Sequence, residues 1–235
     1  MKPALSALYY PLGDQAIVIQ LGDMISKDIH QHITSICNFL EEYSFEGFIE
    51  YVPAFTTVSI FYDPLITDYE TVEPLMQEML EAISEEEVKA AAVTIEIPVL
   101  YGGLQGPDLS FVAAHAGMTE AEVIDLHTSA EYLVYMIGFA PGFPYLGGLD
   151  ERIVVPRKET PGAAIPAGAV GIAGAQTGIY PIETPGGWQI IGQTPLKLFD
   201  VERHPPALLK AGNSLRFMAI TEAEFEEIKK QEDGH

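Results

Sequence analysis

The segment that decides the fold is the run G-F-A-P-G-F-P-Y-L-G-G-L-D (residues 138–150), continued by V-P-R-K-E-T-P-G-A-A-I-P-A-G (155–168) and A-G-A-Q-T-G-I-Y-P-I-E-T-P-G-G-W (173–188). Glycine and proline interrupt short apolar runs throughout it, which is typical of closely spaced strands joined by tight turns. The same texture begins after Glu131 and extends to Asp200. It predicts an all-β barrel or sandwich in the second half of the chain.

Helical patterns flank this run on both sides. Two short helices are expected before it, over residues 107–116 and 119–128; the second opens with T-E-A-E, which nearly makes a capping box. After the run, a strand over residues 214–219 and an acidic helix from Thr221 close the chain. The second half therefore reads as an all-β unit with two short helices and a C-terminal helix.

The first ninety residues have a different pattern. Short apolar runs at 5–10 and 15–20 are separated by P-L-G-D and predict a hairpin. An amphipathic helix follows, with Ser26 as its N-cap. Two further strands are expected at 46–52 and 57–63.

A second helix completes this part of the chain. If Thr71 is its N-cap, Pro74 takes the third helical position, where a missing N–H costs nothing. The resulting order, ββαββα, indicates a small α+β sandwich. We expect one domain over residues 1–90 and a second over 91–235, with the boundary near 88–93.

Composition excludes several classes of function. The chain has 235 residues and a net charge of -22, from 12 Lys plus Arg against 34 Asp plus Glu, which argues against a nucleic-acid partner. No apolar run is long enough to span a bilayer, and no signal peptide is expected, so no membrane partner is predicted. Cys37 is the only cysteine, which rules out an internal disulfide and favours a cytoplasmic location.

Familiar catalytic signatures are absent from the sequence. It has no G-x-x-x-x-G-K-[ST] loop for a nucleotide and no G-x-S-x-G elbow. His30 and His32 are two residues apart on a helix and point to different sides, so no metal site is expected.

Aromatic and polar side chains concentrate in the glycine- and proline-rich run. An apolar cavity with a few polar groups is typical of a site for a small ligand or a proline-containing peptide. The candidate binding residues are Tyr132, Phe139, Phe143, Arg157, Gln176, Thr177, Tyr180 and Trp188, and Tyr145 lies in the same run. The alternative is that these aromatic rings fill the barrel core and the glycines make tight corners. His115 is the candidate proton-transfer group, although a histidine that merely ends a helix is the more frequent finding.

Four segments resemble a known family: Y-G-G-L-Q-G-P-D-L (101–109), residues 138–149, residues 165–181 and residues 184–200. That family holds the B subunit of bacterial ATP-dependent 5-oxoprolinase, KipI-type histidine-kinase inhibitors and chains labelled allophanate hydrolase subunit 1. The resemblance covers nearly the whole chain. It implies an α+β ferredoxin-like N-terminal domain followed by an all-β cyclophilin-like barrel.

The resemblance also implies partners and a co-substrate. Family members act with a homologous, KipA-like C subunit, and the oxoprolinase adds a larger A subunit. Together these open 5-oxo-L-proline to L-glutamate with ATP hydrolysis. Gly162 and Ala169 stand where relatives usually carry arginine and serine, which leaves Arg157 as the nearest cation for a carboxylate.

Two functions from different classes follow. The first is an enzyme subunit, inactive alone, in a complex that uses ATP as co-substrate. The second is a regulatory module that clamps a proline-containing segment of a sensor histidine kinase. We favour the enzymatic role, because every polar residue of the segment G-A-Q-T-G-I-Y-P (174–181) agrees with the family.

Overall fold

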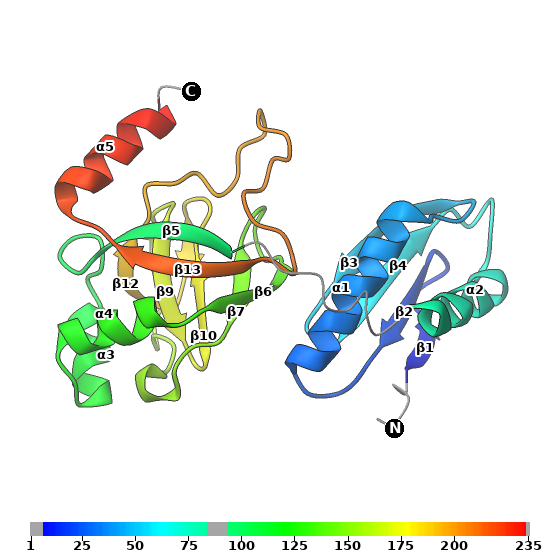
Figure 1. Ribbon diagram of the computed structural model, residues 1–235, viewed down its shortest axis with the longest axis horizontal. Coiled ribbons are helices and arrows are strands. Elements are labelled where there is room, and N and C mark those ends of the chain that lie inside the picture. Colours follow the sequence, from blue (N-terminus) through cyan, green and yellow to red (C-terminus); the bar gives the residue numbers. More distant parts are fainter. Residues whose placement is uncertain (1–6, 84–93, 234–235) are drawn as a thin grey trace. The chain divides into compact units, whose positions relative to one another are not determined.

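The computed structural model describes residues 7–83 and 94–233. The chain divides into two compact units, Met1–Ala91 and Ala92–His235, whose elements are labelled in Figure 1. Each unit has its own hydrophobic core. Within the described residues, no helix has both the length and the apolar character needed to cross a membrane.

The first unit packs two helices on a four-stranded antiparallel sheet. Its strands lie in the order β1-β2-β4-β3. Along the chain the elements are β1 (Leu8–Pro11), β2 (Ala16–Gln20), α1 (Lys27–Glu42), β3 (Phe48–Pro53), β4 (Thr57–Tyr62) and α2 (Tyr69–Ala82). This is the ββαββα order that the sequence predicts.

The two helix starts of this unit differ in how well the sequence predicts them. Ser26 caps α1 as expected, because its hydroxyl accepts the Ile29 N–H at 3.1 Å. The predicted cap of α2 is wrong: Asp68, not Thr71, takes this position, and its carboxylate accepts the Thr71 N–H at 2.9 Å. Pro74 consequently lies inside the helix, where its ring removes one backbone hydrogen bond.

Within the described residues of the second unit, seven strands form a closed barrel. The order around it is β10-β7-β6-β13-β5-β12-β9, with β10 pairing back to β9. All pairs are antiparallel except β13 with β5. The strands are β5 (Thr94–Tyr101), β6 (Tyr132–Ile137), β7 (Pro144–Gly147), β9 (Ala169–Ala173), β10 (Gln176–Ile179), β12 (Gln189–Gln193) and β13 (Ser214–Ala219). This closed barrel agrees with the all-β architecture expected for the second half.

The barrel core is built from alternate residues of its strands. One buried cluster receives side chains from all seven strands, so it fills the interior: Ile97, Val99, Tyr132, Val134, Leu146, Val170, Ile172, Ile179, Ile191, Leu215 and Phe217. A smaller cluster takes the opposite residues of β9 and β12 and residues beside β7 and β10, and therefore lies on the outer face: Phe143, Ile165, Ala169, Ala173, Tyr180, Trp188 and Ile190.

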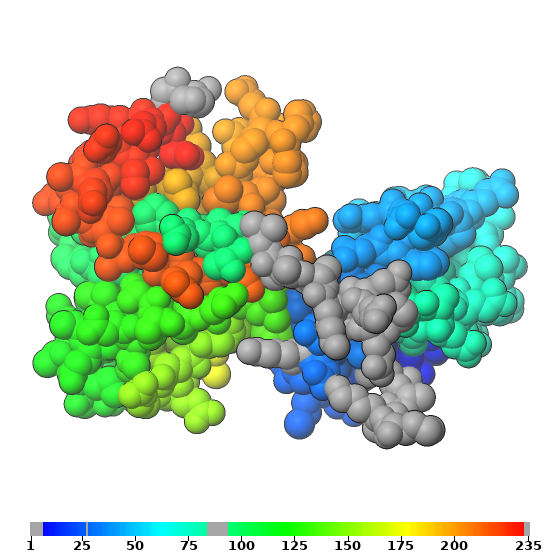
Figure 2. Space-filling view, viewed as in Figure 1, coloured from blue at the N-terminus to red at the C-terminus, as the bar shows by residue number. Residues whose placement is uncertain are grey.

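Short elements complete the second unit. A 3-10 turn, η2 (Glu151–Ile153), precedes a separate strand pair, β8 (Gly162–Ile165) with β11 (Thr184–Gly186). The helices are α3 (Leu109–Ala116), α4 (Glu120–Ser129) and α5 (Glu222–Asp233). Helix α3 begins two residues later than the sequence predicts, with Asp108 as its N-cap, whereas α4 has the full Thr119–Glu122 capping box. Lys197 donates two hydrogen bonds to Glu232, near the C-terminal end of α5. These bonds join the helix to the loop drawn in orange in Figure 2.

Candidate functional site

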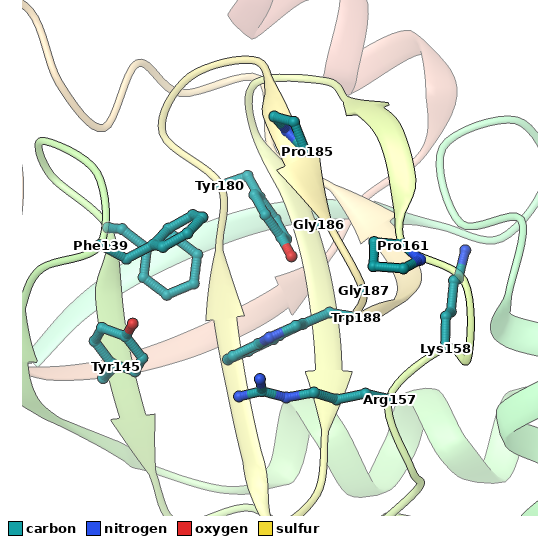
Figure 3. A pocket seen from close by; sticks show the side chains of 11 residues that line it. Phe139, Tyr145, Arg157, Lys158, Pro161, Tyr180, Pro185, Gly186, Gly187 and Trp188 are labelled. Atoms are coloured by element: carbon teal, nitrogen blue, oxygen red, sulfur yellow. The ribbon is translucent and has the colours of Figure 1, made fainter.

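A pocket of about 310 Å³ lies on the outer face of the barrel, beside the turn between β11 and β12. This volume is at the lower end of the range for small-molecule sites. Its residues come from four separate segments (Figure 3): Phe139, Phe143, Tyr145, Arg157, Lys158, Pro161, Tyr180, Pro185, Gly186, Gly187 and Trp188. The fold therefore gathers most of the aromatic side chains of the glycine- and proline-rich run in one place.

Phe143 is the centre of the aromatic wall. Its ring centroid lies 5.4 Å from that of Phe139, 5.0 Å from Tyr145, 5.4 Å from Tyr180 and 5.6 Å from Trp188. Three of these pairs meet nearly edge to face, a geometry that stabilises by about 0.5–1.5 kcal/mol a pair beyond area burial. Phe143 is only 2% exposed and Trp188 only 6%. The centre of the wall is therefore closely packed and apolar.

Gly178 makes room for this wall from within β10. A Cβ atom at this position would lie 2.9 Å from Cζ3 of Trp188 and 3.2 Å from Cζ of Phe143. Both separations are well inside the usual 3.5–4.0 Å contact between carbon atoms. The rings can approach the strand this closely only because the residue is glycine.

Phe139 stands at the mouth of the pocket in an unusual backbone conformation. Its φ angle is +67°, in the left-handed region, and its side chain is 65% exposed. A non-glycine residue held there costs on the order of 1–3 kcal/mol, and such residues cluster at functional sites. Three backbone hydrogen bonds fix the loop: from Ala140 N–H to Gly138 O at 2.8 Å, from Gly138 N–H to Phe143 O at 3.0 Å and from Phe143 N–H to Ala140 O at 3.0 Å. The loop thus presents an aromatic ring to solvent beside the pocket.

Two adjacent cations line the pocket, and they differ in their partners. Lys158 forms an ion pair with Asp108, with 2.6 Å between Nζ and Oδ2. Arg157 is exposed and has no ion-pair partner among the described residues. Figure 3 shows its side chain extended alongside the indole of Trp188. The pocket therefore combines an apolar wall with one unpaired positive charge.

The pKa of the Tyr180 hydroxyl depends on the charged and polar groups around the pocket. Its pKa is raised above the ordinary value, mainly by burial, and a hydrogen bond from the Trp188 backbone and the positive charge of Arg157 reduce that rise. The phenol stays protonated at neutral pH and is available as a polar group on the apolar wall. An anionic ligand with an apolar body fits this combination of groups.

Two predicted site residues lie inside the barrel instead of in the pocket. Thr177 is fully buried, and its hydroxyl donates to the Gly171 carbonyl at 3.0 Å. Because that proton is used, His127 must donate from Nε2 to Thr177 Oγ1 at 2.9 Å, and its Nδ1 accepts from the Tyr101 hydroxyl at 2.7 Å. Tyr132 is also fully buried and donates to the His127 carbonyl at 2.9 Å. These residues form a polar network of the core.

His127 is the fully buried histidine of this network. Burial lowers its pKa to about 3, so the imidazole is neutral under ordinary conditions. Its ring stacks on Phe217 with 4.4 Å between centroids. The sequence marks His127 only as a histidine near a helix end, and nothing in the local pattern indicates its burial.

The remaining predicted residues divide between the pocket and other places. Phe139, Phe143, Arg157, Tyr180 and Trp188 line the pocket. Gln176 is half-buried at the start of β10, and His115 is exposed on α3, where it stacks on Phe111 with 6.1 Å between centroids. Neither Gln176 nor His115 is a lining residue.

Sequence reasoning missed Lys158 and Asp108. The lysine is adjacent to Arg157, but the pairing that distinguishes the two cations joins positions 50 residues apart. Asp108 follows G-P at a helix start, where an aspartate is read as a cap. Among the described residues, no group of three or more His, Cys, Asp or Glu side chains is arranged to hold a metal ion.

Comparison with known proteins places the chain. Residues 7–209 match the family model described as "Carboxyltransferase domain, subdomain C and D". The chain is 47% identical over 231 residues to the 5-oxoprolinase B subunit of Bacillus subtilis (strain 168), with 94% of this chain and 95% of that protein covered. It is 41% identical over 210 residues to the 5-oxoprolinase B subunit of Escherichia coli O157:H7, with 89% and 94% covered.

A solved structure is similar over most of the chain. The crystal structure of TTHA0988 superposes with a TM-score of 0.79 at 32% identity, with 88% of this chain covered. The chain spans only 41% of that longer protein. Since the sequence matches extend over nearly the full length of both B subunits, the chain belongs to the family of 5-oxoprolinase B subunits.

Proposed function

We propose that this chain is the B subunit of an ATP-dependent 5-oxoprolinase that converts 5-oxo-L-proline to L-glutamate. It acts with the homologous C subunit and the larger A subunit. The observation that carries the proposal is the 47% identity to a 5-oxoprolinase B subunit over 95% of that protein.

The outer pocket is our proposed binding site for 5-oxoproline. The ligand has a compact lactam ring and one carboxylate. The ring packs against the aromatic wall around Phe143, and the carboxylate accepts hydrogen bonds from the guanidinium of Arg157. A monoanion matches the single unpaired cation of the pocket. Phe139, at the mouth, covers the bound ring.

We assign no ATP site to the pocket of this chain. A nucleoside triphosphate carries several negative charges, whereas the pocket offers one unpaired cation in about 310 Å³. No glycine-rich phosphate loop of the P-loop type is present in the sequence. We therefore assign ATP binding to the partner subunits or to a surface shared with them, and no step to this chain.

His115 is the proposed proton-transfer group, and it lies outside the pocket. His115 is exposed on α3 and is not among the lining residues, so it can serve as a proton shuttle only at a surface that another protein of the complex completes. The expectation that the isolated chain is catalytically inactive follows from the same argument. Both are part of the proposal.

The finer fold names also belong to the proposal. The first unit has the element order β-β-α-β-β-α. This order is a circular permutation of the ferredoxin-like order β-α-β-β-α-β, in which the last strand is moved to the start of the chain. The all-antiparallel sheet is compatible with that permutation. We describe residues 1–90 as a ferredoxin-like domain and 91–235 as a cyclophilin-like barrel, a boundary supported by the division of the chain at Ala91.

The test is an assay of the assembled complex. The chain is co-expressed with the A and C subunits, and phosphate release is measured as a function of 5-oxoproline concentration. Arg157→Ala should raise KM about 30-fold, as expected for losing about 2 kcal/mol of charged hydrogen bonding. Arg152→Ala is the matched control, because Arg152 pairs with Asp150 and does not line the pocket.

Each outcome decides a different part of the proposal. Wild-type complex without 5-oxoproline-dependent phosphate release would contradict the enzymatic role. Inhibition of a sensor histidine kinase by the chain would then support the regulatory alternative. If the complex is active and Arg157→Ala leaves KM unchanged, the pocket is not the 5-oxoproline site, but the enzymatic role stands.

A further inference from the structure

Asp108 occupies the N-cap of α3 but does not cap the helix. An N-cap aspartate ordinarily accepts a hydrogen bond from the first turn, and α3 shows no such side-chain bond. Instead, Oδ2 of Asp108 accepts the Ile190 N–H at 2.7 Å and pairs with Lys158 Nζ at 2.6 Å. The Lys158 and Asp108 side chains are only 26% and 18% exposed. The carboxylate therefore links strand β12 to the segment that carries Arg157.

That segment is also fixed by its backbone. The Lys158 N–H donates to the Gly187 carbonyl at 2.7 Å. On the other side of Arg157, the Pro156 carbonyl accepts from Nε2 of Gln189 at 3.1 Å. Arg157 thus stands between two residues that are bonded to the chain entering β12, while its own side chain extends along Trp188 (Figure 3).

We propose that the Asp108–Lys158 pair is a positioning device that holds Arg157 against the pocket, with Asp108 as a positioning residue for the ligand carboxylate. The proposal rests on the role of Arg157 under the proposed function. The pair has two effects: it anchors the residue next to Arg157, and it neutralises Lys158, so that Arg157 is the cation left for the ligand. It also gives a purpose to the G-P-D segment (106–108), which the site otherwise does not use.

Two substitutions break the pair with opposite changes of charge. Asp108→Asn frees the positive charge of Lys158, whereas Lys158→Met removes it and leaves Asp108 unpaired. If the pair positions Arg157, both variants should raise KM for 5-oxoproline in the assembled complex. If the pair acts only through the charge near the pocket, the two variants should shift KM in opposite directions.

The expected effect is a KM increase of about 5- to 20-fold in both variants with kcat unchanged, since small misplacements of a binding group cost this much or more. Lys158→Arg should restore KM, because the guanidinium can still pair with Asp108. In an Arg157→Ala background, Asp108→Asn should add little, since there is no longer a guanidinium to position. Asp125→Asn and Lys210→Met are the matched controls at exposed positions.

Structural damage is detected independently. Emission of Trp188 and the thermal unfolding midpoint of each variant show whether the pocket remains folded. Opposite KM shifts, a fall in kcat with unchanged KM, or an Asp108→Asn effect that persists undiminished without Arg157 would each overturn the positioning role. If Arg157→Ala alone lowers affinity but both pair-breaking variants behave as wild type, the proposed function stands and the inference fails.

Discussion

Replacing Gly178 with alanine tests the construction of the pocket most directly. The added Cβ would lie 2.9 Å from Cζ3 of Trp188, 3.1 Å from the Pro144 carbonyl oxygen and 3.2 Å from Cζ of Phe143. None of these atoms is the free end of a flexible side chain, so the strand or the rings must move. Overpacking of this kind costs about 1–3 kcal/mol. Alanine recovers about 0.4–1 kcal/mol by restricting the unfolded chain, which leaves a net loss of about 1–2 kcal/mol.

The assay uses the single tryptophan of the chain. Trp188 lies against Gly178, so urea unfolding followed by its emission reports on the barrel unit and on the pocket together. Gly187→Ala is the matched control, because a Cβ there meets its nearest neighbour at 3.7 Å, an ordinary contact. That variant should stay within about 0.5 kcal/mol of wild type.

Displacement of the indole should also appear before unfolding. In folded Gly178→Ala protein, we expect emission shifted to the red as Trp188 moves toward the pocket opening, and weaker binding of 5-oxoproline in the complex. Gly178→Ala protein with wild-type stability and emission would refute the close packing of β10 against the rings. Equal losses of unfolding free energy in Gly178→Ala and Gly187→Ala would show that the effect is not specific to the close packing at Gly178.

Two further predictions concern the core and the pocket mouth. The native pKa of His127 is about 3 and the unfolded value about 6.5, so the unfolded chain binds an extra proton as the pH falls through this window. Urea titrations should show the free energy of unfolding decreasing by on the order of 4 kcal/mol as the pH falls from about 6.5 to 3. The His127→Phe variant should lose most of this pH dependence. The same pH dependence in the variant and in the wild type would contradict the prediction. Phe139→Gly should be more stable than Phe139→Ala by about 1 kcal/mol, because only glycine adopts φ +67° without strain, and equal thermal midpoints would show that the loop is unstrained.

The element order of the fold can be predicted because its signals are local. Turn residues and apolar periodicity indicate the β-rich run of the second half and the cap at Ser26. The start of α2 is predicted three residues late, because Thr71 and Asp68 are both good caps and only the folded chain shows which side chain accepts the bond. Closure of the barrel depends on pairs distant in sequence, such as β13 beside β5, and no local pattern indicates them.

The sequence predicts which types of residue form the candidate site, but not which of those residues face the pocket. Phe139, Phe143, Tyr180, Trp188 and Arg157 are indicated by their chemistry and line the pocket, whereas Tyr132 has the same chemistry and is buried in the barrel. Thr177 lies in the same segment as Tyr180 (174–181), yet its side chain points into the barrel. The register of the strand decides which face each residue takes. The pairing of Lys158 with Asp108 is out of reach of a sequence pattern for a related reason: it joins a loop to a helix start through the fold.

Strand β10 explains why the core network and the pocket depend on one another. Successive residues point to opposite faces, so Thr177 bonds His127 inside the barrel while Gly178 receives Trp188 outside it. A shift of one residue would turn the glycine toward the barrel interior and the threonine toward the aromatic wall. The hydrogen bond between Thr177 and His127 and the packing of Trp188 on Gly178 both require this register, so the core network and the aromatic rings depend on the same alignment of β10 with β7 and β9.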